Sequence, residues 1–358
     1  MKLLEIYKIG SLTLKNKIVM APLTRSRSNS DGIPSDLNVE YYKQRASAGL
    51  IIAEATAISK NSLGYINAPS IYSQEHIKGW KKITDGVHKE GGIIFLQMFH
   101  VGRVTHSDFF DGELPIAPSS IKADGEVYTP QGKKNFETPR ALELNEIPSV
   151  VQEFKIAAQN AKDAGFDGIE IHGANGYLIN QFIDDISNNR TDIYGGSIEN
   201  RSRFLFEVLD AVLEVWDSKR VGLRLSPSGI FHSVGDANAR ETYSTIIEKL
   251  NTYSLAYLHL MNPMMPIDQR PELEPDVAGF YGSKYKGTLM MNGHYTKDSG
   301  NELLEKNLAD LVSYGSLFIS NPDLPKRFEL NTALNVPDQN TFYTGGKEGY
   351  TDYPFLNK

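Results

Sequence analysis

The chain has 358 residues, of which 40% are hydrophobic and 23% charged, so it can bury a large core and is not a disordered or fibrous protein. Its formal net charge of -7 argues against nucleic acid or an anionic membrane as the main partner, because both are bound by basic surfaces. The absence of cysteine excludes a disulfide framework, a thiol nucleophile and a thiolate metal site. The N-terminus has no signal-peptide pattern and no apolar stretch long enough to span a bilayer, so we expect a cytoplasmic protein.

Short apolar segments alternate with helical patterns along the chain. Strands are expected at residues 17–22, 49–55, 93–98, 168–171, 221–226, 255–260, 288–291 and 310–314. Helices are expected over residues 37–48, 74–89, 148–164, 199–216, 238–253 and 299–306. Eight strand–helix units are the number in a closed (β/α)8 barrel, so the sequence predicts an α/β TIM barrel.

Two segments interrupt this alternation. Residues 103–144 follow the third strand and are polar and rich in Pro, Gly and Thr, which favours a capping excursion over a second domain. The tail over residues 331–358 holds several tyrosines, which favours an ordered loop. We therefore expect a single domain over residues 1–358. A doubly wound open sheet is the alternative, but the Gly-x-Gly turn of a dinucleotide fold is missing from the sequence.

Polar or small residues follow most of the predicted strands. In a TIM barrel the functional groups lie at the carboxyl ends of the strands, so these positions indicate a ligand site. They are Thr24 and Arg25 after the first strand, Ala57 after the second, Gln97 and His100 at the third, His172 at the fourth, Arg224 in the fifth, Asn292 and Gly293 after the seventh, and Gly315 and Ser316 after the eighth.

The stretch His172–Phe182 begins where the fourth strand ends and carries the richest chemistry. His172, Asn175 and Tyr177 supply, within six residues, one group that can exchange a proton and two further hydrogen-bonding groups. Such a trio can hold an oxygen atom and protonate a neighbouring atom. The alternative is purely structural: a buried core histidine, a helix N-cap and a packed aromatic residue.

Several motifs together resemble the Old Yellow Enzyme family of FMN-dependent ene-reductases. They are residues 16–25, 49–57, 172–182, 200–204, 321–324 and 349–354. The His172/Asn175 pair is similar to the yeast and plant branches of that family, whereas the length and the tail resemble the bacterial N-ethylmaleimide reductase group. The resemblance covers essentially the whole chain.

The resemblance implies how FMN would be bound. Thr24 would donate to flavin O4, with a hydrogen bond to its own backbone as the alternative. Pro22, Leu23 and Ala57 would bring backbone groups to the isoalloxazine ring. Gln97 would contact the pyrimidine edge, because a side-chain amide both donates and accepts. Arg224 would lie near flavin N1 and O2, where a positive charge stabilises the reduced flavin; a buried ion pair is the alternative.

The chain departs from the family at the phosphate end. There the family has a glycine-rich turn after strand seven and a Gly-Arg pair after strand eight, where this chain has Asn292, Gly293 and His294, and then Gly315 and Ser316. Serine in place of arginine removes a charge-assisted contact, which His294 would restore if its ring reached the phosphate. Phe99 is a second departure, since the family usually has tryptophan there.

The reaction implied by the resemblance is the reduction of activated C=C bonds in α,β-unsaturated carbonyl or nitro compounds. NADPH or NADH would reduce FMN, and an enone, nitro compound or maleimide would then bind in the same place. His172 and Asn175 would hold the substrate oxygen while Tyr177 protonates the α-carbon. Tyr65, Phe99 and Tyr343 would line the substrate pocket. No metal is expected, and the protein would be a monomer or homodimer.

Two other functions are compatible with a barrel. A Schiff-base aldolase would need a lysine at the carboxyl end of a strand, and the predicted strands have none there. A barrel with weakened or lost FMN binding could serve as a small-molecule binding module, and Ser316 is the observation that supports it.

Overall fold

The computed structural model describes residues 1–356 and contains a closed barrel of eight parallel strands, as predicted. The barrel strands are β3 (Ile18–Met20), β4 (Leu50–Ala57), β5 (Ile94–Phe99), β10 (Gly168–Gly173), β11 (Val221–Leu225), β12 (Tyr257–Met261), β13 (Leu289–Asn292) and β14 (Leu311–Tyr314). They pair in chain order, and β14 closes the barrel against β3. The strands are buried on both faces, which explains why their sequences are apolar runs without alternation.

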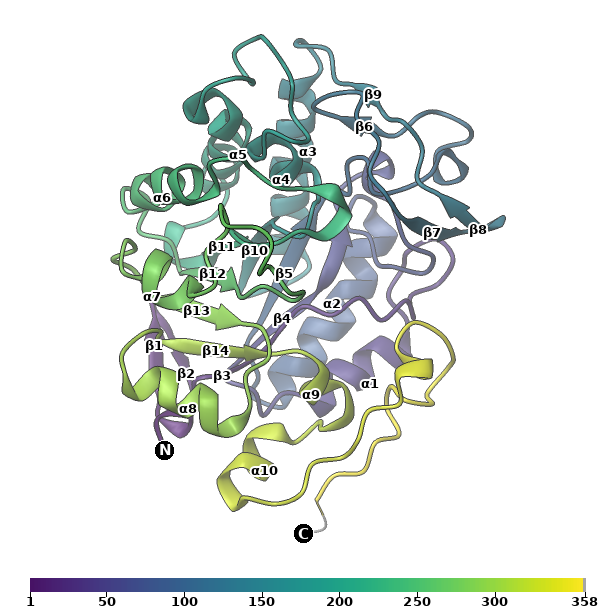
Figure 1. Cartoon of the computed structure of the whole chain (residues 1–358). Helices are drawn as coiled ribbons and strands as arrows, with labels where there is room; N and C mark the ends of the chain where they lie inside the picture. The colour runs from purple at the N-terminus through teal and green to yellow at the C-terminus, as the bar shows by residue number, and fades with distance from the viewer. Residues whose placement is uncertain (357–358) are drawn as a thin grey trace.

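Helices surround the strands (Figure 1). They are α1 (Asp36–Gln44), α2 (Gln74–Lys89), α3 (Ile147–Asp163), α4 (Leu178–Ile183), α5 (Ile198–Leu213), α6 (Ala239–Leu250), α7 (Val277–Gly282), α8 (Lys297–Glu305), α9 (Ser316–Ser320) and α10 (Leu324–Leu330). The six predicted helices are confirmed with ends that differ by a few residues. The other four were not predicted, because each is too short to show a helical period.

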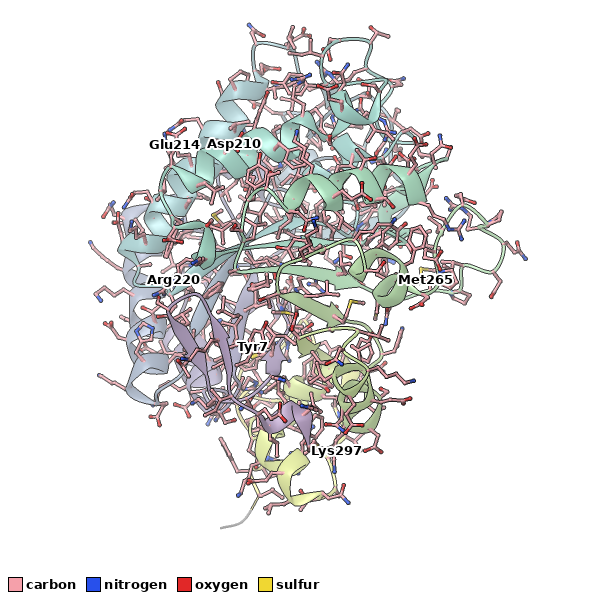
Figure 2. The ribbon with its side chains drawn as sticks, turned by 90° about the vertical axis from the view of Figure 1, so that its left-hand side faces the viewer. Tyr7, Asp210, Glu214, Arg220, Met265 and Lys297 are labelled. Carbon is pink, nitrogen blue, oxygen red and sulfur yellow. The ribbon has the colours of Figure 1, made fainter. Side chains whose placement is uncertain are left out.

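The N-terminal end of the barrel is closed by a hairpin that was not predicted. Strands β1 (Tyr7–Ile9) and β2 (Leu12–Leu14) pair antiparallel, and Ile9 and Leu14 pack against Phe95 inside the barrel. Figure 2 views the barrel from the side, with Tyr7 and Arg220 towards this end of the strands and Met265 beyond their carboxyl ends. The closed end leaves the opposite rim for a ligand.

The excursion after β5 forms two small sheets beside the rim (Figure 1). Strand β6 (Ile116–Ala117) pairs with β9 (Arg140–Ala141), and β7 (Glu126–Thr129) forms a hairpin with β8 (Gly132–Asn135). Val127 and Phe136 belong to a small apolar cluster that contacts Tyr177. The excursion therefore reaches the stretch that the sequence marked as functional.

Six short 3-10 helices complete the secondary structure of the described residues. They are η1 (Lys2–Leu4), η2 (Lys60–Ser62), η3 (Ser107–Phe109), η4 (Ser218–Arg220), η5 (Phe231–Ser233) and η6 (Gln339–Thr341). Within residues 1–356, no helix combines the length and apolar composition needed to cross a bilayer.

The tail is held by two arginines that follow β3. Arg25 is fully buried and donates to the carbonyl oxygens of Phe342 and Gly349 at 3.0 and 2.8 Å. Arg27 donates to four more tail carbonyls, those of residues 341, 344, 346 and 348, at 2.7 to 3.1 Å. These guanidinium groups fix residues 341–349 against the rim, and with them Tyr343.

Candidate active site

A cavity of about 510 Å³ lies at the carboxyl ends of the barrel strands. Its lining includes many of the residues expected from the sequence: Pro22, Leu23, Thr24, Asn175, Arg224, Asn292, Gly293, Gly315, Ser316 and Tyr343. Phe231, Met261, Met264 and Tyr295 also line it and were not predicted. The polar groups come from several strand ends, which is the usual construction of a TIM-barrel site.

The remaining predicted residues lie next to this lining. His172 is the strand partner of Arg224, so the two side chains start from adjacent positions on β10 and β11. Tyr65, Ala57, Phe99 and Tyr177 pack together in one apolar cluster. Gln97 is 1% exposed and is paired in register with Glu170 inside the barrel.

His172 presents a hydrogen-bond donor. Its Nδ1 accepts from the backbone N–H of Ala174 at 3.3 Å, so the ring hydrogen of the neutral imidazole lies on Nε2. Burial, and then the charge of Arg224, lower the pKa of His172 well below its ordinary value. The ring is therefore neutral near pH 7 and can donate through Nε2 without carrying a charge.

Asn175 has an unusual backbone that aims its side chain at the cavity. Its φ is +59°, a left-handed conformation that asparagine tolerates better than most residues. Ser226 Oγ accepts from its N–H, and His232 Nδ1 hydrogen-bonds to its carbonyl oxygen. The side-chain Oδ1 is buried with no partner within the described residues. The N-cap alternative is wrong, because the N-cap residue of α4 is Tyr177.

Tyr177 is a protonated phenol at the centre of an aromatic group. Its ring packs edge-on against His172 and Phe99, with ring centroids 4.9 and 5.3 Å apart. Its hydroxyl lies 2.8 Å from that of Tyr65. Burial raises the pKa of Tyr177 well above its ordinary value and raises the pKa of Tyr65 to about 12. Tyr177 can therefore give a proton, and Tyr65 is its hydrogen-bond partner.

Arg224 keeps much of its hydrogen-bonding capacity for a ligand. Its Nη2 donates to the side-chain oxygen of Asn292 at 2.9 Å, whereas its buried Nε has no partner among residues 1–356. The bond is made to an amide and not to a carboxylate, so the ion pair considered from the sequence is not its anchor. Burial lowers the pKa of Arg224, and the charge of Glu170 opposes that effect.

The proposed phosphate end contains two close backbone approaches. Gly293 has a φ of +109°, and a side chain there would come within 3.0 Å of Asn262 Cβ. A side chain at Gly315 would meet Leu23 at 3.3 Å. The side chain of Asn292 accepts from Arg224 and donates one N–H to the carbonyl oxygen of Ser313, which leaves its second N–H for a ligand.

His232 and Arg103 are parts of the site that the sequence did not indicate. The ring of His232 lies 5.7 Å from that of Tyr177, and its Nδ1 is 2.7 Å from the carbonyl oxygen of Asn175. Arg103 donates to the carbonyl oxygens of His232 and Ser233 and so holds this segment in place. Neither residue follows a predicted strand, so no pattern in the sequence could have identified them.

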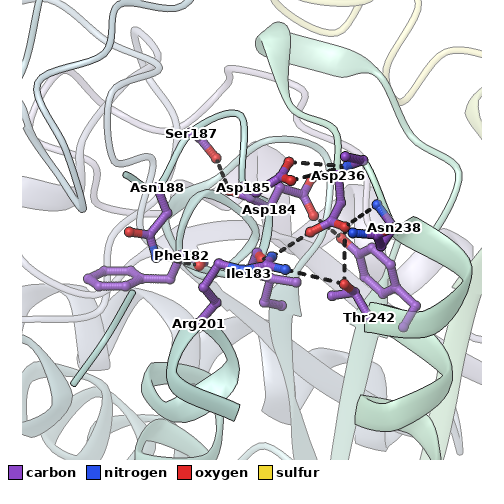
Figure 3. A network of polar contacts seen from close by, with 12 residues as sticks. Phe182, Ile183, Asp184, Asp185, Ser187, Asn188, Arg201, Asp236, Asn238 and Thr242 are labelled. Carbon is purple, nitrogen blue, oxygen red and sulfur yellow. Dashed lines mark hydrogen bonds and ion pairs between the residues drawn. The ribbon is translucent and has the colours of Figure 1, made fainter. Parts of the chain in front are cut away.

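Helix α4 anchors the functional stretch from behind. Asn180 accepts from the N–H of Gly176 at 2.9 Å and donates to Asp184, which also accepts from Tyr243. Burial raises the pKa of Asp184 to about 7. Figure 3 shows the neighbouring ion pair of Arg201 and Asp236 beside Ile183 and Asp184.

The whole chain matches known flavin oxidoreductases. Residues 2–335 match the NADH:flavin oxidoreductase / NADH oxidase family. The chain is 43% identical over 362 residues to 12-oxophytodienoate reductase 2 of Arabidopsis thaliana, covering 99% of this chain and 96% of the relative. It is 42% identical over 378 residues to flavin oxidoreductase hxnT of Emericella nidulans, covering 97% and 96% of the two chains.

Solved structures agree with this match. Morphinone reductase in complex with tetrahydroNAD has a TM-score of 0.93 and 46% identity, covering 99% of this chain and 98% of that one. The old yellow enzyme homologue from Zymomonas mobilis has a TM-score of 0.94 and 40% identity, covering 99% and 100%.

Proposed function

Because the chain belongs to the NADH:flavin oxidoreductase / NADH oxidase family, we propose that it reduces the C=C bonds of α,β-unsaturated carbonyl and nitro compounds. Membership of this family makes it an FMN-dependent oxidoreductase of the Old Yellow Enzyme type that uses a nicotinamide reductant. The observation that carries the proposal is the grouping at one rim of the neutral His172, the protonated Tyr177 and Asn175, whose side-chain oxygen has no partner among residues 1–356, so that its amide is free to turn its N–H groups to a ligand. An oxygen clamp and a proton donor side by side are what the reduction of a conjugated alkene needs.

FMN, when bound, supplies the hydride that reaches the β-carbon of the alkene. The residues present fit this cofactor: Arg224 offers unused donors, and Gly293 and Gly315 leave room for close backbone approach. Pro22, Leu23, Thr24 and Ala57 would line the isoalloxazine ring, and Gln97 its pyrimidine edge. Backbone N–H groups near Gly293, Gly315 and Ser316 would hold the phosphate.

The residues of the rim would act on the substrate in complementary ways. His172 Nε2 and the Asn175 amide donate to the carbonyl or nitro oxygen, which withdraws electron density from the alkene. Tyr177 gives its proton to the α-carbon, and Tyr65 stabilises the phenolate that forms. Phe99 and Tyr343 bound the space in which the alkene lies. The excursion over residues 103–144 and the tail would belong to the same single domain.

The test is direct. The protein should purify yellow with absorbance near 450 nm and should oxidise NADH or NADPH in the presence of cyclohexenone, with the C=C bond and not the C=O bond reduced. Product analysis by mass spectrometry separates the two outcomes. Flavin reduction by NADH without turnover of any enone, nitroalkene or maleimide would contradict the substrate class and leave the family assignment intact.

The binding-module alternative has less support. Ser316 removes one charged contact, but the family assignment brings FMN as the cofactor, and the cavity keeps Arg224 and the two glycines. A colourless protein that fails to take up added FMN would favour the alternative.

A further inference from the structure

Six polar residues are connected by hydrogen bonds through the interior of the barrel, and the connection at Ser313 uses both its side chain and its backbone carbonyl oxygen. All are at most 8% exposed, and each comes from a different strand. They are Gln97 on β5, Glu170 on β10, His259 on β12, Ser313 on β14, Asn292 on β13 and Arg224 on β11. Buried polar groups are costly unless they are paired, so a chain of this length points to a purpose other than packing.

The first half of the chain runs from Gln97 to Ser313. Gln97 Nε2 donates to Glu170 Oε1 at 2.7 Å. Glu170 Oε2 lies 2.8 Å from His259 Nδ1, and His259 Nε2 lies 2.8 Å from Ser313 Oγ. Both carboxylate oxygens of Glu170 and both ring nitrogens of His259 thus have hydrogen-bond partners.

The second half continues from Ser313 to Arg224. Asn292 Nδ2 donates to the carbonyl oxygen of Ser313 at 2.9 Å, and Asn292 Oδ1 accepts from Arg224 Nη2 at 2.9 Å. The two ends of the chain, Gln97 and Arg224, are the residues proposed above to contact the pyrimidine edge of FMN. The residues between them lie behind the contact surface.

The carboxylate of Glu170 fixes the orientation of the Gln97 side-chain amide. Because a carboxylate only accepts, the amide nitrogen of Gln97 must face Glu170, and the amide oxygen is left for a ligand. An amide without such a partner could turn its oxygen and nitrogen around. Glu170 therefore decides which hydrogen-bonding group Gln97 presents.

The same carboxylate balances charge. Arg224 lies within the barrel with no partner for its Nε among residues 1–356, and the charge of Glu170 opposes the effect of burial on its pKa. The other titratable groups near Arg224 are His172, His259, Tyr257 and Tyr177, whose electrostatic neighbours include Arg224. Glu170 is the one carboxylate among these described groups, so its removal would leave a net positive charge beneath the flavin.

We infer that Glu170, His259 and Ser313 are positioning residues that fix the Gln97 amide and offset the charge of Arg224, and so set the affinity for oxidised FMN and its reduction potential. The inference rests on the proposed placement of FMN against Gln97 and Arg224. Glu170, His259 and Ser313 would act through Gln97 and Arg224 and not by contact with the cofactor or the substrate.

Glu170→Gln tests the inference, because it removes the charge and keeps the shape and the number of hydrogen-bonding groups. The dissociation constant of oxidised FMN, measured by fluorescence quenching on the apoprotein, should weaken about threefold to tenfold as the Gln97 amide loses its fixed orientation. The positive charge of Arg224, no longer balanced by Glu170, should stabilise the anionic form of reduced FMN. A tenfold gain in the affinity for reduced over oxidised FMN corresponds to a rise of about 30 mV in the two-electron potential, which dye equilibration resolves.

Ser313→Ala is the second variant. It breaks the bond to His259 and removes no charge, so it should weaken FMN binding while leaving the potential near that of the unmodified protein. Glu153→Gln is the matched control, because it makes the same chemical change at a half-buried carboxylate on α3, outside the barrel. It should change neither quantity.

The possible results distinguish a failure of the proposed FMN site from a failure of the roles proposed for Glu170, His259 and Ser313. If the unmodified apoprotein fails to bind FMN, the proposed site is wrong. If it binds FMN and Glu170→Gln leaves the potential unchanged, or if Ser313→Ala raises the potential equally, the charge-balancing role is overturned. If Glu170→Gln leaves the dissociation constant unchanged, the orienting role is overturned.

Discussion

Replacing Tyr177 by phenylalanine removes one hydroxyl group and little else. The ring would keep its edge-on contacts with His172 and Phe99 at 4.9 and 5.3 Å. The lost group is the phenol that we propose as the proton donor to the α-carbon. General acid catalysis contributes roughly a hundredfold to ten-thousandfold, so cyclohexenone reduction should slow by about that factor. A nitroalkene should be much less affected, because its reduced product leaves as a stable nitronate that does not need the proton at once.

Tyr65 provides the internal control for this prediction. Its hydroxyl lies 2.8 Å from that of Tyr177, and we propose that it stabilises the phenolate that develops as the proton leaves. A hydrogen bond to a charged group contributes about 1.5–3 kcal/mol, so Tyr65→Phe should slow cyclohexenone reduction by roughly tenfold to a hundredfold. Since Tyr65 acts through Tyr177, the double variant should be no slower than Tyr177→Phe alone.

The assay is a single turnover of the prereduced protein, followed by the return of absorbance near 450 nm. Tyr128→Phe, an exposed tyrosine on the β7–β8 hairpin, serves as the matched control and should have no effect. Equal slowing of cyclohexenone and nitroalkene by Tyr177→Phe would refute the role of this hydroxyl as the α-carbon acid. Additive effects of the two tyrosine changes would show that Tyr65 acts independently of Tyr177.

Heat denaturation should release FMN and not FAD, because the sequence lacks an adenosine-binding turn; chromatography of the released flavin checks this. Ser316→Arg should lower the dissociation constant of FMN by roughly tenfold or more, because it restores a charged phosphate contact of about 1.5–3 kcal/mol, and an unchanged constant would show that another group already fills the role. The double change of His172 and Asn175 to alanine should slow enone reduction by about a hundredfold or more while FMN stays bound, since one lost oxyanion donor costs about 2.7–4 kcal/mol. The raised pKa of Asp184, about 7, means that the native state holds a proton that the unfolded state loses near pH 4, so stability should fall by up to about 1.4 kcal/mol per pH unit as the pH rises from 4 to 7. Asp184→Asn should flatten that dependence in urea titrations, and an unchanged slope would assign it to another group.

The barrel could be predicted from the sequence because each strand is buried on both faces and each long helix on one. Residues 74–89 show this well: the apolar side chains that set the period, Ile77, Trp80, Ile83 and Val87, are all buried in α2, whose bounds match the prediction. The hairpin over residues 7–14 was missed because its strands are three residues long, too short for an alternating pattern.

Some residues of the site could also be predicted from the sequence, and others could not. Residues at strand ends, such as Thr24 and Arg224, could be placed because the topology brings all strand ends to one rim. His232 could not be placed, because it lies in the short η5 segment between β11 and α6 and reaches Tyr177 through a left-handed backbone that Arg103 supports. Glu170 and His259 sit in the middle of apolar runs, where the pattern alone suggests core residues and gives no sign that they face each other.

The hydrogen bonds from Arg25 and Arg27 to the tail have a consequence for folding during synthesis on the ribosome. The two guanidinium groups follow the first barrel strand, yet most of their hydrogen-bond acceptors are carbonyl oxygens between residues 341 and 349. A newly made N-terminal half therefore lacks most of these acceptors, and keeps only the Tyr41 hydroxyl for Arg25 and the Arg25 carbonyl oxygen for Arg27. Removal of residues 341–349 would take these carbonyl acceptors away from both buried guanidinium groups, so the tail stabilises the segment that directly follows the first barrel strand.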